Sequence, residues 1–313
     1  MHLPKFKLTP LRGILLFIVF TILAGCVTLE QKERELIFRP SREEWRYGGA
    51  RDNFEERWIP VATKSGDAGK IHAWWAAGPT PDAPVVLYLH GARWNLSGSA
   101  SRIPRWQKLG FAVLAIDYRG FGQSTGPDDT PSEASAYEDA QVAWDYLKAA
   151  TPNNRHFIVG HSLGGAVAVN LAEHNPDASG LVLEATFTSI ADIISESKWG
   201  FIPVGFLLTQ RFDAMQRIAD VKVPILFVHG TADSIVPTHM SQELYDAARA
   251  PKKLIIVQGG THHNLSSVAF EDYRSAIGEL FGVGVNGGIT AHAATPPGSG
   301  QARSLPASSR TGS

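Results

Sequence analysis

A serine, an aspartate and a histidine that together could perform nucleophilic chemistry follow one another along the chain. Ser162, Asp233 and His262 each come after a short apolar run that is typical of a buried strand. A serine hydroxyl is a weak nucleophile near neutral pH, so it needs a histidine that accepts its proton and a carboxylate that holds the histidine in the correct tautomer. We therefore expect Ser162 to attack a carbonyl carbon, His262 to relay the proton and Asp233 to orient His262.

Two segments match the Gly-x-Ser-x-Gly pattern of a nucleophile elbow, residues 160–164 and residues 122–126. In such an elbow the serine stands on a sharp turn between a strand and a helix, and small residues are required two positions before and two positions after it. Ser162 lies between an apolar run and a segment with helical spacing, whereas Ser124 leads into Pro-Asp-Asp-Thr-Pro, which cannot form a helix interior. The context predicts Ser162 as the nucleophile and Ser124 as a loop serine.

The acid and the base each have one competitor in the sequence. Glu184 ends another apolar run and is the alternative acid, although a carboxylate there is also typical of a group that binds loop amides. His263 directly follows His262 and is the alternative base. We favour Asp233 and His262, because folds with a nucleophile elbow place the acid and then the base in late loops, in the chain order serine, acid, histidine.

Two backbone amides are expected to stabilise the negative charge that develops on the attacked carbonyl oxygen. Leu163 supplies the first, and it opens a predicted helix whose N-terminal dipole favours negative charge at this position. Ala92, in the loop after the apolar run Val85 to Leu89, supplies the second. Arg93 and Trp94 come next, and they either line the mouth of the site or are a solvent-facing arginine beside a packing tryptophan.

The elements that must position these residues are apolar runs typical of strands, which alternate with segments typical of helices. The apolar runs are Val85 to Leu89, Phe111 to Ile116, Phe157 to Val159, Leu181 to Leu183, Ile225 to Val228 and Leu254 to Val257. The helical segments are Ser135 to Ala149, Gly164 to His174, Met240 to Arg249 and Phe270 to Phe281. Continuous apolar runs suit strands that are buried on both faces, so we predict an α/β fold with helices on both faces of a mostly parallel sheet. Chemistry in such sheets lies at the carboxyl ends of the strands.

Composition excludes several other classes of protein. Of the 313 residues 44% are hydrophobic and 19% are charged, as in ordinary globular proteins, and the net charge of −1 leaves no excess of positive charge for nucleic acid. The single cysteine allows neither an intramolecular disulfide nor a cysteine-rich zinc site, and no histidines have metal-ligand spacing, so we expect no metal and no cofactor. His90 and His229, each before a glycine at a strand end, are predicted to be hydrogen-bonded turn residues.

The N-terminus is typical of a targeting signal. Residues 1–13 are basic and contain no acid, and residues 14–25 are apolar, which are the first two regions of a secretory signal peptide. The apolar run ends in Leu-Ala-Gly-Cys, which resembles the lipobox of bacterial lipoproteins, so Cys26 is predicted to carry acyl chains that anchor the chain in the bacterial cell envelope. Val27 in place of aspartate slightly favours the outer membrane. The alternative is an uncleaved anchor over residues 13–29, at the short end of what spans a bilayer.

The chain is predicted to contain four regions. Residues 1–25 are the signal peptide, and residues 26–57, densely charged with interspersed apolar residues, are a tether and the edge of the domain. Residues 58–282 form the α/β domain. Residues 283–313 are rich in Gly, Ser, Ala, Thr and Pro and cannot bury enough apolar surface to offset the entropy of ordering, so we predict a disordered tail.

Taken together, the motifs resemble the α/β-hydrolase superfamily over residues 35–282, and most of all the Bem46-like and ABHD13/ABHD17-like branch of serine hydrolases. The segments that carry the resemblance are His90-Gly91, Asp117 to Gly122, Gly160 to Gly165, His229 to Pro237 and the loop Gly259 to Asn264.

The resemblance implies an α/β-hydrolase fold in which Asp117 and Arg119 are structural. It also implies that residues 187–221, the insertion after the sixth strand, are a short apolar lid, with ordinary helix packing on the sheet as the alternative. In the family the last motif usually reads His-Asn-Asp, whereas residues 262–264 of this chain read His-His-Asn.

The expected function is that of a membrane-tethered serine hydrolase that cleaves small carboxylic esters or thioesters, lipid-like ones among them, through an acyl-enzyme. Amidases and peptidases share this fold, so amide cleavage is the near alternative. A catalytically silent lipoprotein that uses the fold as a binding module is the alternative from another class. The sequence gives no indication of the oligomeric state.

Overall fold

The computed structural model of the chain describes residues 27–43, 54–62, 68–126, 130–197 and 204–284. The predicted signal peptide, Cys26 and the predicted tail from residue 285 onward lie outside these residues. Within the described ranges, no helix is long and apolar enough to cross a membrane.

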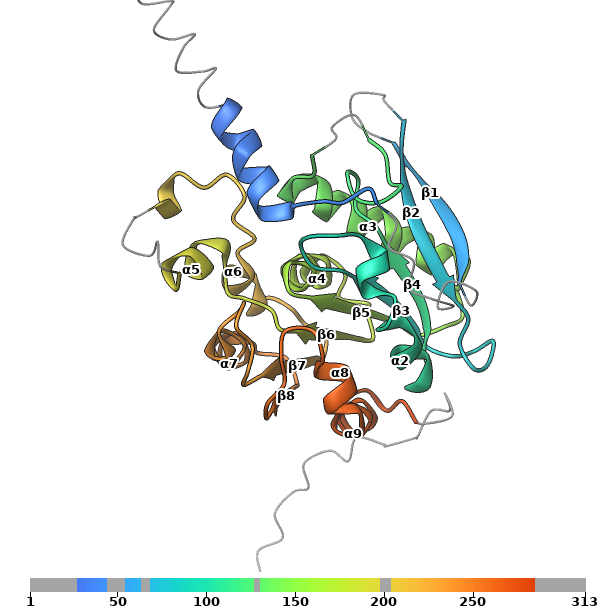
Figure 1. The fold of residues 1–313 in the computed structure, drawn as a ribbon. Helices are drawn as coiled ribbons and strands as arrows, with labels where there is room; N and C mark the ends of the chain where they lie inside the picture. The colour runs from blue at the N-terminus through green and yellow to red at the C-terminus, as the bar shows by residue number, and fades with distance from the viewer. Residues whose placement is uncertain (1–26, 44–53, 63–67, 127–129, 198–203, 285–313) are drawn as a thin grey trace, which may run out of the picture.

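An eight-stranded sheet forms the centre of the molecule, in the order β1-β2-β4-β3-β5-β6-β7-β8 (Figure 1). The strands are β1 (Glu55–Ala62), β2 (Ala68–Ala76), β3 (Val85–Leu89), β4 (Ala112–Ile116), β5 (His156–His161), β6 (Gly180–Glu184), β7 (Ile225–Gly230) and β8 (Lys252–Val257). All neighbours from β4 through β8 in this order are parallel, whereas β1 pairs antiparallel with β2 and β2 antiparallel with β4. The predicted mostly parallel sheet is confirmed, and each predicted apolar run is one of its strands.

The hairpin-like pair β1 and β2 is the part of the sheet that the sequence does not predict. β1 lies at the edge of the sheet, and within it only Ile59 and Val61 are buried. An edge strand with one solvated face alternates exposed and buried residues, so it lacks the continuous apolar character of the parallel strands. The charged start of β1, Glu-Glu-Arg, therefore resembles a linker in sequence.

Helices cover both faces of the sheet and enclose two hydrophobic cores (Figure 1). Successive strand residues point to opposite faces, so Leu87 and Leu89 belong to one core, and Val86 and Tyr88 belong to the other. The first core is closed by α3 (Glu133–Ala150), α4 (Leu163–His174), α6 (Ala214–Ile218) and α7 (Thr238–Ala247), and the second by α2 (Ile103–Lys108), α8 (Leu265–Val268) and α9 (Phe270–Phe281). The predicted helices are confirmed to within a few residues at their ends.

The segment predicted as a lid follows β6. Among its described residues it contains α5 (Ile190–Ser195), a 3₁₀ helix η3 (Val204–Phe206) and α6. Phe212 is fully buried in the first core, whereas Phe206 and Leu207 are exposed. The segment therefore combines a part that packs on the domain with a part that presents apolar surface.

The described N-terminal residues are packed on the domain. A helix over residues 27–38 is followed by a short segment that reaches residue 43, and both lie beside the later part of the chain (Figure 1). Phe38 is fully buried, and its ring packs edge-on against Phe121 and Phe212 with centroids 6.3 and 5.6 Å away. This part of the predicted tether thus contributes a side chain to the first core.

A second contact joins the same helix to the segment before α6. The Glu33 carboxylate accepts hydrogen bonds from the backbone amides of Thr209 and Gln210, at 2.9 and 2.8 Å. β1 starts at Glu55, within the region predicted as tether and domain edge. Glu33 and Phe38 of the helix over residues 27–38 thus contact the domain directly.

Candidate active site

Ser162 stands on the sharp turn between β5 and α4. Its φ is +55°, a backbone conformation that residues with a side chain rarely adopt. A Cβ on Gly160 would collide with the carbonyl oxygen of Gly164, and a Cβ on Gly164 would collide with the backbone at the end of β3. The requirement for small residues on either side of the serine therefore has a direct steric cause.

Ser124, the serine of the second matching segment, is fully buried and makes structural hydrogen bonds. Its Oγ donates to the carbonyl oxygen of Asp117 at 2.7 Å and accepts from the amide of His72 at 2.8 Å. These bonds join the loop after β4 to β2. Ser124 is therefore a loop serine whose hydroxyl is fully engaged.

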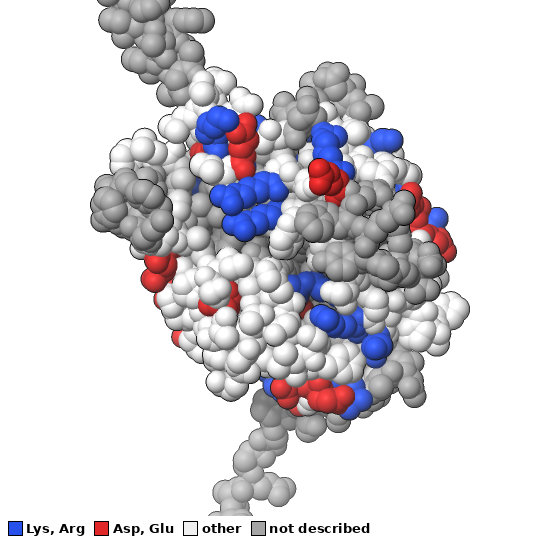
Figure 2. All heavy atoms as spheres, viewed as in Figure 1, with Lys and Arg blue, Asp and Glu red and all other residues white. Residues whose placement is uncertain are grey.

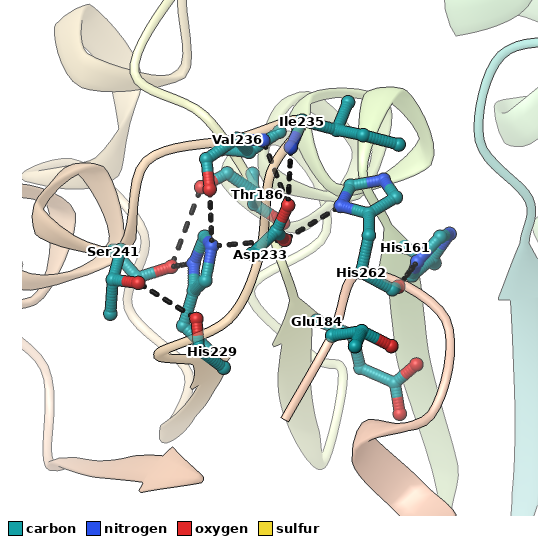
Figure 3. A network of polar contacts seen from close by, with 12 residues as sticks. His161, Glu184, Thr186, His229, Asp233, Ile235, Val236, Ser241 and His262 are labelled. Atoms are coloured by element: carbon teal, nitrogen blue, oxygen red, sulfur yellow. Dashed lines mark hydrogen bonds and ion pairs between the residues drawn. The ribbon is translucent and has the colours of Figure 1, made fainter. Parts of the chain in front are cut away.

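Asp233 and His262 meet at the carboxyl edge of the sheet, in the loops after β7 and β8 (Figure 3). His262 Nδ1 lies 2.7 Å from Asp233 Oδ2. Asp233 Oδ1 accepts from the amides of Ile235 and Val236 at 2.8 and 2.9 Å. Because the carboxylate accepts at Nδ1, the neutral ring carries its proton there, and Nε2 is left able to accept a proton.

His229 supports Asp233 from behind, although its sequence position predicted only a turn histidine. Its side chain is fully buried, and Nε2 lies 3.2 Å from Asp233 Oδ2 and 3.0 Å from the carbonyl oxygen of Val236. Both of these atoms are acceptors, so Nε2 carries the proton, and the Ser241 hydroxyl, 2.6 Å from Nδ1, donates to the ring. Figure 3 shows this network on the side of Asp233 away from His262.

The Asp233 carboxylate is held in its charged form. Burial on its own raises the pKa of a carboxyl group, but the hydrogen bonds from His229, His262 and the Val236 amide outweigh it and hold the pKa of Asp233 well below its ordinary value. A carboxylate that stays charged keeps the proton on His262 Nδ1 and stabilises the imidazolium that forms when Nε2 accepts a proton.

Ser162 and His262 line one cavity. Its lining residues are His90, Gly91, Ala92, Arg93, Trp94, Asn95, Gly98, Ser99, Arg102, His161, Ser162, Ile235, His262 and His263. Ser162 Oγ makes no hydrogen bond with another described residue, so the serine and His262 share the wall without a bond between them. Such a bond is often long or absent before substrate binds. The structure thus brings the predicted serine and histidine into one cavity, with Asp233 directly behind the histidine.

Of the two residues whose amides are predicted to form the oxyanion hole, one lines the cavity and the other follows a lining residue in the chain. Ala92 lines the cavity, and Leu163 follows Ser162 as the first residue of α4. Neither amide donates a hydrogen bond to another described residue, so both donors are available to a ligand.

The loop that carries Ala92 has an unusual backbone. Arg93 and Trp94 have φ values of +70° and +59°, and both side chains are exposed and line the cavity. The amide of Arg93 donates a hydrogen bond to the carbonyl oxygen of Phe38 at 2.7 Å. The amide of Ser41 donates one to the carbonyl oxygen of Trp94 at 2.9 Å. The N-terminal segment therefore holds the loop, and the Arg93 and Trp94 side chains both lie at the mouth of the site.

Glu184, the alternative acid, has other partners. Its fully buried carboxylate binds the Arg102 guanidinium at 3.0 Å and accepts from the Tyr273 hydroxyl at 2.9 Å. Arg102 in turn lies 3.0 Å from His161 Nε2. Glu184 therefore binds neither the His262 ring nor loop amides, and it instead neutralises Arg102, a buried arginine in the cavity wall.

His263, the alternative base, lines the cavity next to His262. The two ring centroids are 5.1 Å apart, and the His263 ring lies 6.0 Å from that of Trp94. Burial, together with the neighbouring His262 and Arg102, lowers the pKa of His263, which keeps its ring neutral. Among the described residues, the Asp233 carboxylate is hydrogen-bonded to the His262 ring and not to the His263 ring.

Asp117 and Arg119 take the structural roles that the resemblance implies. Asp117 is buried, accepts from the amide of Leu96 at 2.8 Å and lies 3.2 Å from His90 Nε2, so it holds the loop after β3. The Arg119 guanidinium binds Asp139 of α3 at 2.5 Å.

Two further expectations, the apolar lid and the absence of a metal, stay predictions. No described residue of the predicted lid lines the cavity, so the lid stays a prediction. In the part of the chain that the structure describes, no group of three or more histidine, cysteine, aspartate or glutamate side chains is arranged to hold a metal ion.

Comparison with known proteins gives matches over the part of the chain that holds these residues. A family model described as serine aminopeptidase, S33, matches residues 80–210 and 204–267. An uncharacterized protein of Mycobacterium tuberculosis strain H37Rv is 33% identical over 207 residues, 65% of this chain and 72% of that protein. The lysophosphatidylserine lipase ABHD12 of Rattus norvegicus is 32% identical over 216 residues, 62% of this chain and 52% of that protein.

Solved structures agree on the fold. An esterase of Pyrococcus furiosus superposes with a TM-score of 0.63 at 20% identity, over 79% of this chain and 99% of that chain. At this identity the likeness concerns the fold alone, and the predicted α/β-hydrolase fold is confirmed.

Proposed function

This chain belongs to the family described as serine aminopeptidase, S33, within the α/β-hydrolases, and from that premise we propose that it is a serine hydrolase that cleaves carboxylic esters or thioesters through an acyl-enzyme. The observation that carries the proposal is the cavity that Ser162 and His262 line together, with Asp233 bonded to the far side of His262 at 2.7 Å. A buried, charged carboxylate behind a histidine is what serine activation needs.

In the proposed reaction Ser162 Oγ attacks the carbonyl carbon while His262 Nε2 accepts its proton. The amides of Ala92 and Leu163 bind the oxyanion, and the N-terminus of α4 adds a favourable dipole. The tetrahedral intermediate collapses to an acyl-serine, and the leaving alcohol or thiol takes the proton from His262. Water then attacks the acyl carbon while His262 Nε2 accepts its proton, and the second tetrahedral intermediate collapses to the carboxylic acid as His262 returns that proton to the leaving Ser162 Oγ.

Esters are preferred over amides on the strength of one relative. The lysophosphatidylserine lipase ABHD12 is 32% identical to this chain over 216 residues, and its name supports ester cleavage here. The matching family model is described by the name of an aminopeptidase, and that name is the specific reason to keep amide cleavage as the second candidate.

The proposal includes a membrane tether. Cys26, at the end of an apolar run that resembles a lipobox, is the acylated residue, and the bacterial cell envelope, preferably the outer membrane, is the location. A membrane position brings lipid-like acyl compounds within reach of the site. Incorporation of a labelled fatty acid in vivo by the wild type, and its loss in Cys26→Ala, is the expected result; equal labelling of both would contradict the lipid anchor.

Hydrolysis of matched substrates tests the reaction class. The purified full chain is assayed with p-nitrophenyl butyrate, the corresponding thioester and butyryl p-nitroanilide, beside Ser162→Ala. We expect hydrolysis of the ester and the thioester that disappears in the variant. Faster cleavage of the anilide would favour the amidase, and no hydrolysis of any of the three by the folded wild type would contradict the proposal.

A further inference from the structure

We propose that Arg93 forms a subsite for an anionic group, a carboxylate or a phosphate, on the same substrate whose carbonyl carbon Ser162 attacks. The inference rests on the proposed hydrolase function and adds a substrate class to it. It is drawn from the charge of the cavity wall, the lack of a partner for one arginine, and the backbone that holds this arginine at the mouth.

The ionisable groups that line the cavity are all basic or imidazole groups. They are Arg93, Arg102, His90, His161, His262 and His263, and no aspartate or glutamate is among the lining residues. The charge of Arg102 is neutralised by Glu184 at 3.0 Å. Figure 2 shows Lys and Arg side chains across the middle of one face, between the helix over residues 27–38 and the region of α2.

Arg93 differs from Arg102 in having no partner. Its side chain is exposed, and among the described residues its guanidinium has neither an ion pair nor a hydrogen bond. Arg119, on the neighbouring loop after β4, is by contrast bound to Asp139. A guanidinium presents paired donors that match a carboxylate or a phosphate, so an unpaired one at the mouth of a cavity without acids favours an anion there.

The backbone fixes where this cation stands. Arg93 has a φ of +70° and Trp94 one of +59°, conformations that are unfavourable for residues with a side chain. The carbonyl oxygen of Phe38, a fully buried residue, accepts from the Arg93 amide and holds this arrangement. Strain that the surrounding structure maintains at a site is an indication of function, and here its effect is to keep both side chains at the cavity.

The position of Arg93 also limits where the anionic group lies in the substrate. Arg93 directly follows Ala92, whose amide is proposed to bind the oxyanion. Since Arg93, Ala92 and Ser162 line the same cavity, an anion on Arg93 belongs to the molecule whose carbonyl is attacked, either to its acyl chain or to its alcohol. Trp94 and Ile235, exposed and also lining the cavity, offer apolar surface for the remainder of the substrate.

The test uses the full chain and compares matched esters with and without one anionic group. The acyl arm pairs mono-p-nitrophenyl glutarate with p-nitrophenyl pentanoate, and the alcohol arm pairs 1-oleoyl-glycerol 3-phosphate with 1-oleoylglycerol. The measured quantity is the ratio of kcat/KM for the charged ester to kcat/KM for the neutral one, which corrects for any loss of folded enzyme. Arg93→Gln, Arg93→Lys and the control Arg249→Gln are compared with the wild type. Arg249 is exposed and lies between α7 and β8, at the amino ends of the strands.

We expect the ratio to fall about tenfold in Arg93→Gln in at least one arm, as for the loss of one charge-assisted contact, and less in Arg93→Lys. The responding arm identifies the acyl or the alcohol side as the source of the anion. In the wild type the ratio is expected to fall as NaCl rises from about 50 mM to about 500 mM, because salt screens the attraction.

Two results would overturn the subsite while leaving the hydrolase in place. One is an unchanged ratio in both arms for Arg93→Gln, and the other is an equal fall in Arg249→Gln, which would mean that net charge and not this position matters. Failure of the wild type to hydrolyse any of the four esters would instead overturn the proposed function.

Discussion

The two sides of the cavity are held in different ways. On the side of the proposed acid and base, Asp233 is fixed by hydrogen bonds from His262, from two neighbouring amides and from His229, which lies at the end of β7. On the oxyanion side, the loop with Ala92 has positive φ values at its next two residues and is held by Phe38 and Ser41, which precede the whole sheet in the chain. The first side is built from residues that are close in sequence, near β7 and β8. The second side depends on contacts between the loop after β3 and a segment that precedes β1.

This difference predicts different consequences of substitution. Changes on the acid and base side alter the charge and tautomer of one imidazole and leave the walls of the cavity in place. Changes in the N-terminal segment alter the walls, because the segment packs in the first core through Phe38 and binds the oxyanion loop directly.

The largest effect is expected for Asp233→Asn. The amide offers a donor to His262 Nδ1 and so favours the wrong tautomer, and kcat/KM for an ester should fall about 10³- to 10⁴-fold, as for the loss of the triad aspartate in known serine proteases. The measurement is the steady-state rate with p-nitrophenyl butyrate, with Asp272→Asn on the exposed face of α9 as the control. A variant that keeps more than about a tenth of the activity would contradict the assignment of Asp233.

The next effect concerns His229 as a positioning residue. His229→Leu removes the Nε2 donor from Asp233, so the pKa of Asp233 rises toward its ordinary value, and kcat should fall about 10- to 100-fold with little change in KM. The low-pH loss of activity should begin at a higher pH than in the wild type. In His229→Gln the side-chain Nε2 can still donate to Asp233, so both kcat and the pH at which activity is lost should move part of the way back toward the wild type. Superimposable pH profiles for Leu, Gln and wild type would show that His229 is only a packing residue.

The effect of the N-terminal segment on activity can be separated from its effect on stability by substituting a buried phenylalanine in that segment and another elsewhere in the fold. Phe38→Ala and Phe111→Ala each remove a ring with almost no exposed surface, and each should lower the free energy of unfolding by about 3–5 kcal/mol. Only Phe38→Ala should also lower kcat/KM of the folded fraction, about tenfold, because the oxyanion amide is displaced. Equal activities of the two variants per folded molecule, from denaturant melts and active-site titration, would remove the functional role of the segment.

The smallest effect is a pH-dependent stability difference. The folded-state pKa of Asp233 lies below that of the unfolded chain, so its carboxylate stabilises the fold above the unfolded pKa of about 4, and this stabilisation is lost as the pH falls toward the folded pKa. At pH 7 the free energy of unfolding of Asp233→Asn should therefore be about 1–3 kcal/mol lower than that of the wild type. This difference in free energy should become smaller below about pH 4. Urea melts at several pH values measure it, and a gap that widens in acid would contradict the charge state assigned to Asp233.

The sequence predicts the parts of the site that local patterns encode. The strand, sharp turn and helix around Ser162 follow from two glycines and two apolar stretches, and Asp233 and His262 follow from their places after late strands. The helices and the parallel strands follow from continuous apolar runs and helical spacing. These features can be predicted from local sequence patterns alone, without knowing which distant residues are in contact.

The features that the sequence does not predict are contacts between distant segments. The position of Glu184 at a strand end makes it an alternative acid in the sequence, yet its partners are Arg102 and Tyr273, which come from the loop before α2 and from α9. The sequence around His229 predicts only a turn histidine, because nothing in it shows that the Asp233 carboxylate lies beside the ring. The docking of Phe38 beside Phe212 has no local signal, since a charged segment with scattered apolar residues is equally typical of a linker.

The measurement that tests the central claim most directly is labelling of the full chain with a fluorophosphonate probe, which reacts with an activated serine. Wild type, Ser162→Ala and Ser124→Ala are compared, with thermal melts to confirm that each is folded. We expect labelling of the wild type and of Ser124→Ala and none of Ser162→Ala. Labelling that persists in Ser162→Ala, or none in the folded wild type, would contradict it, and the latter result would favour a binding module on the same fold.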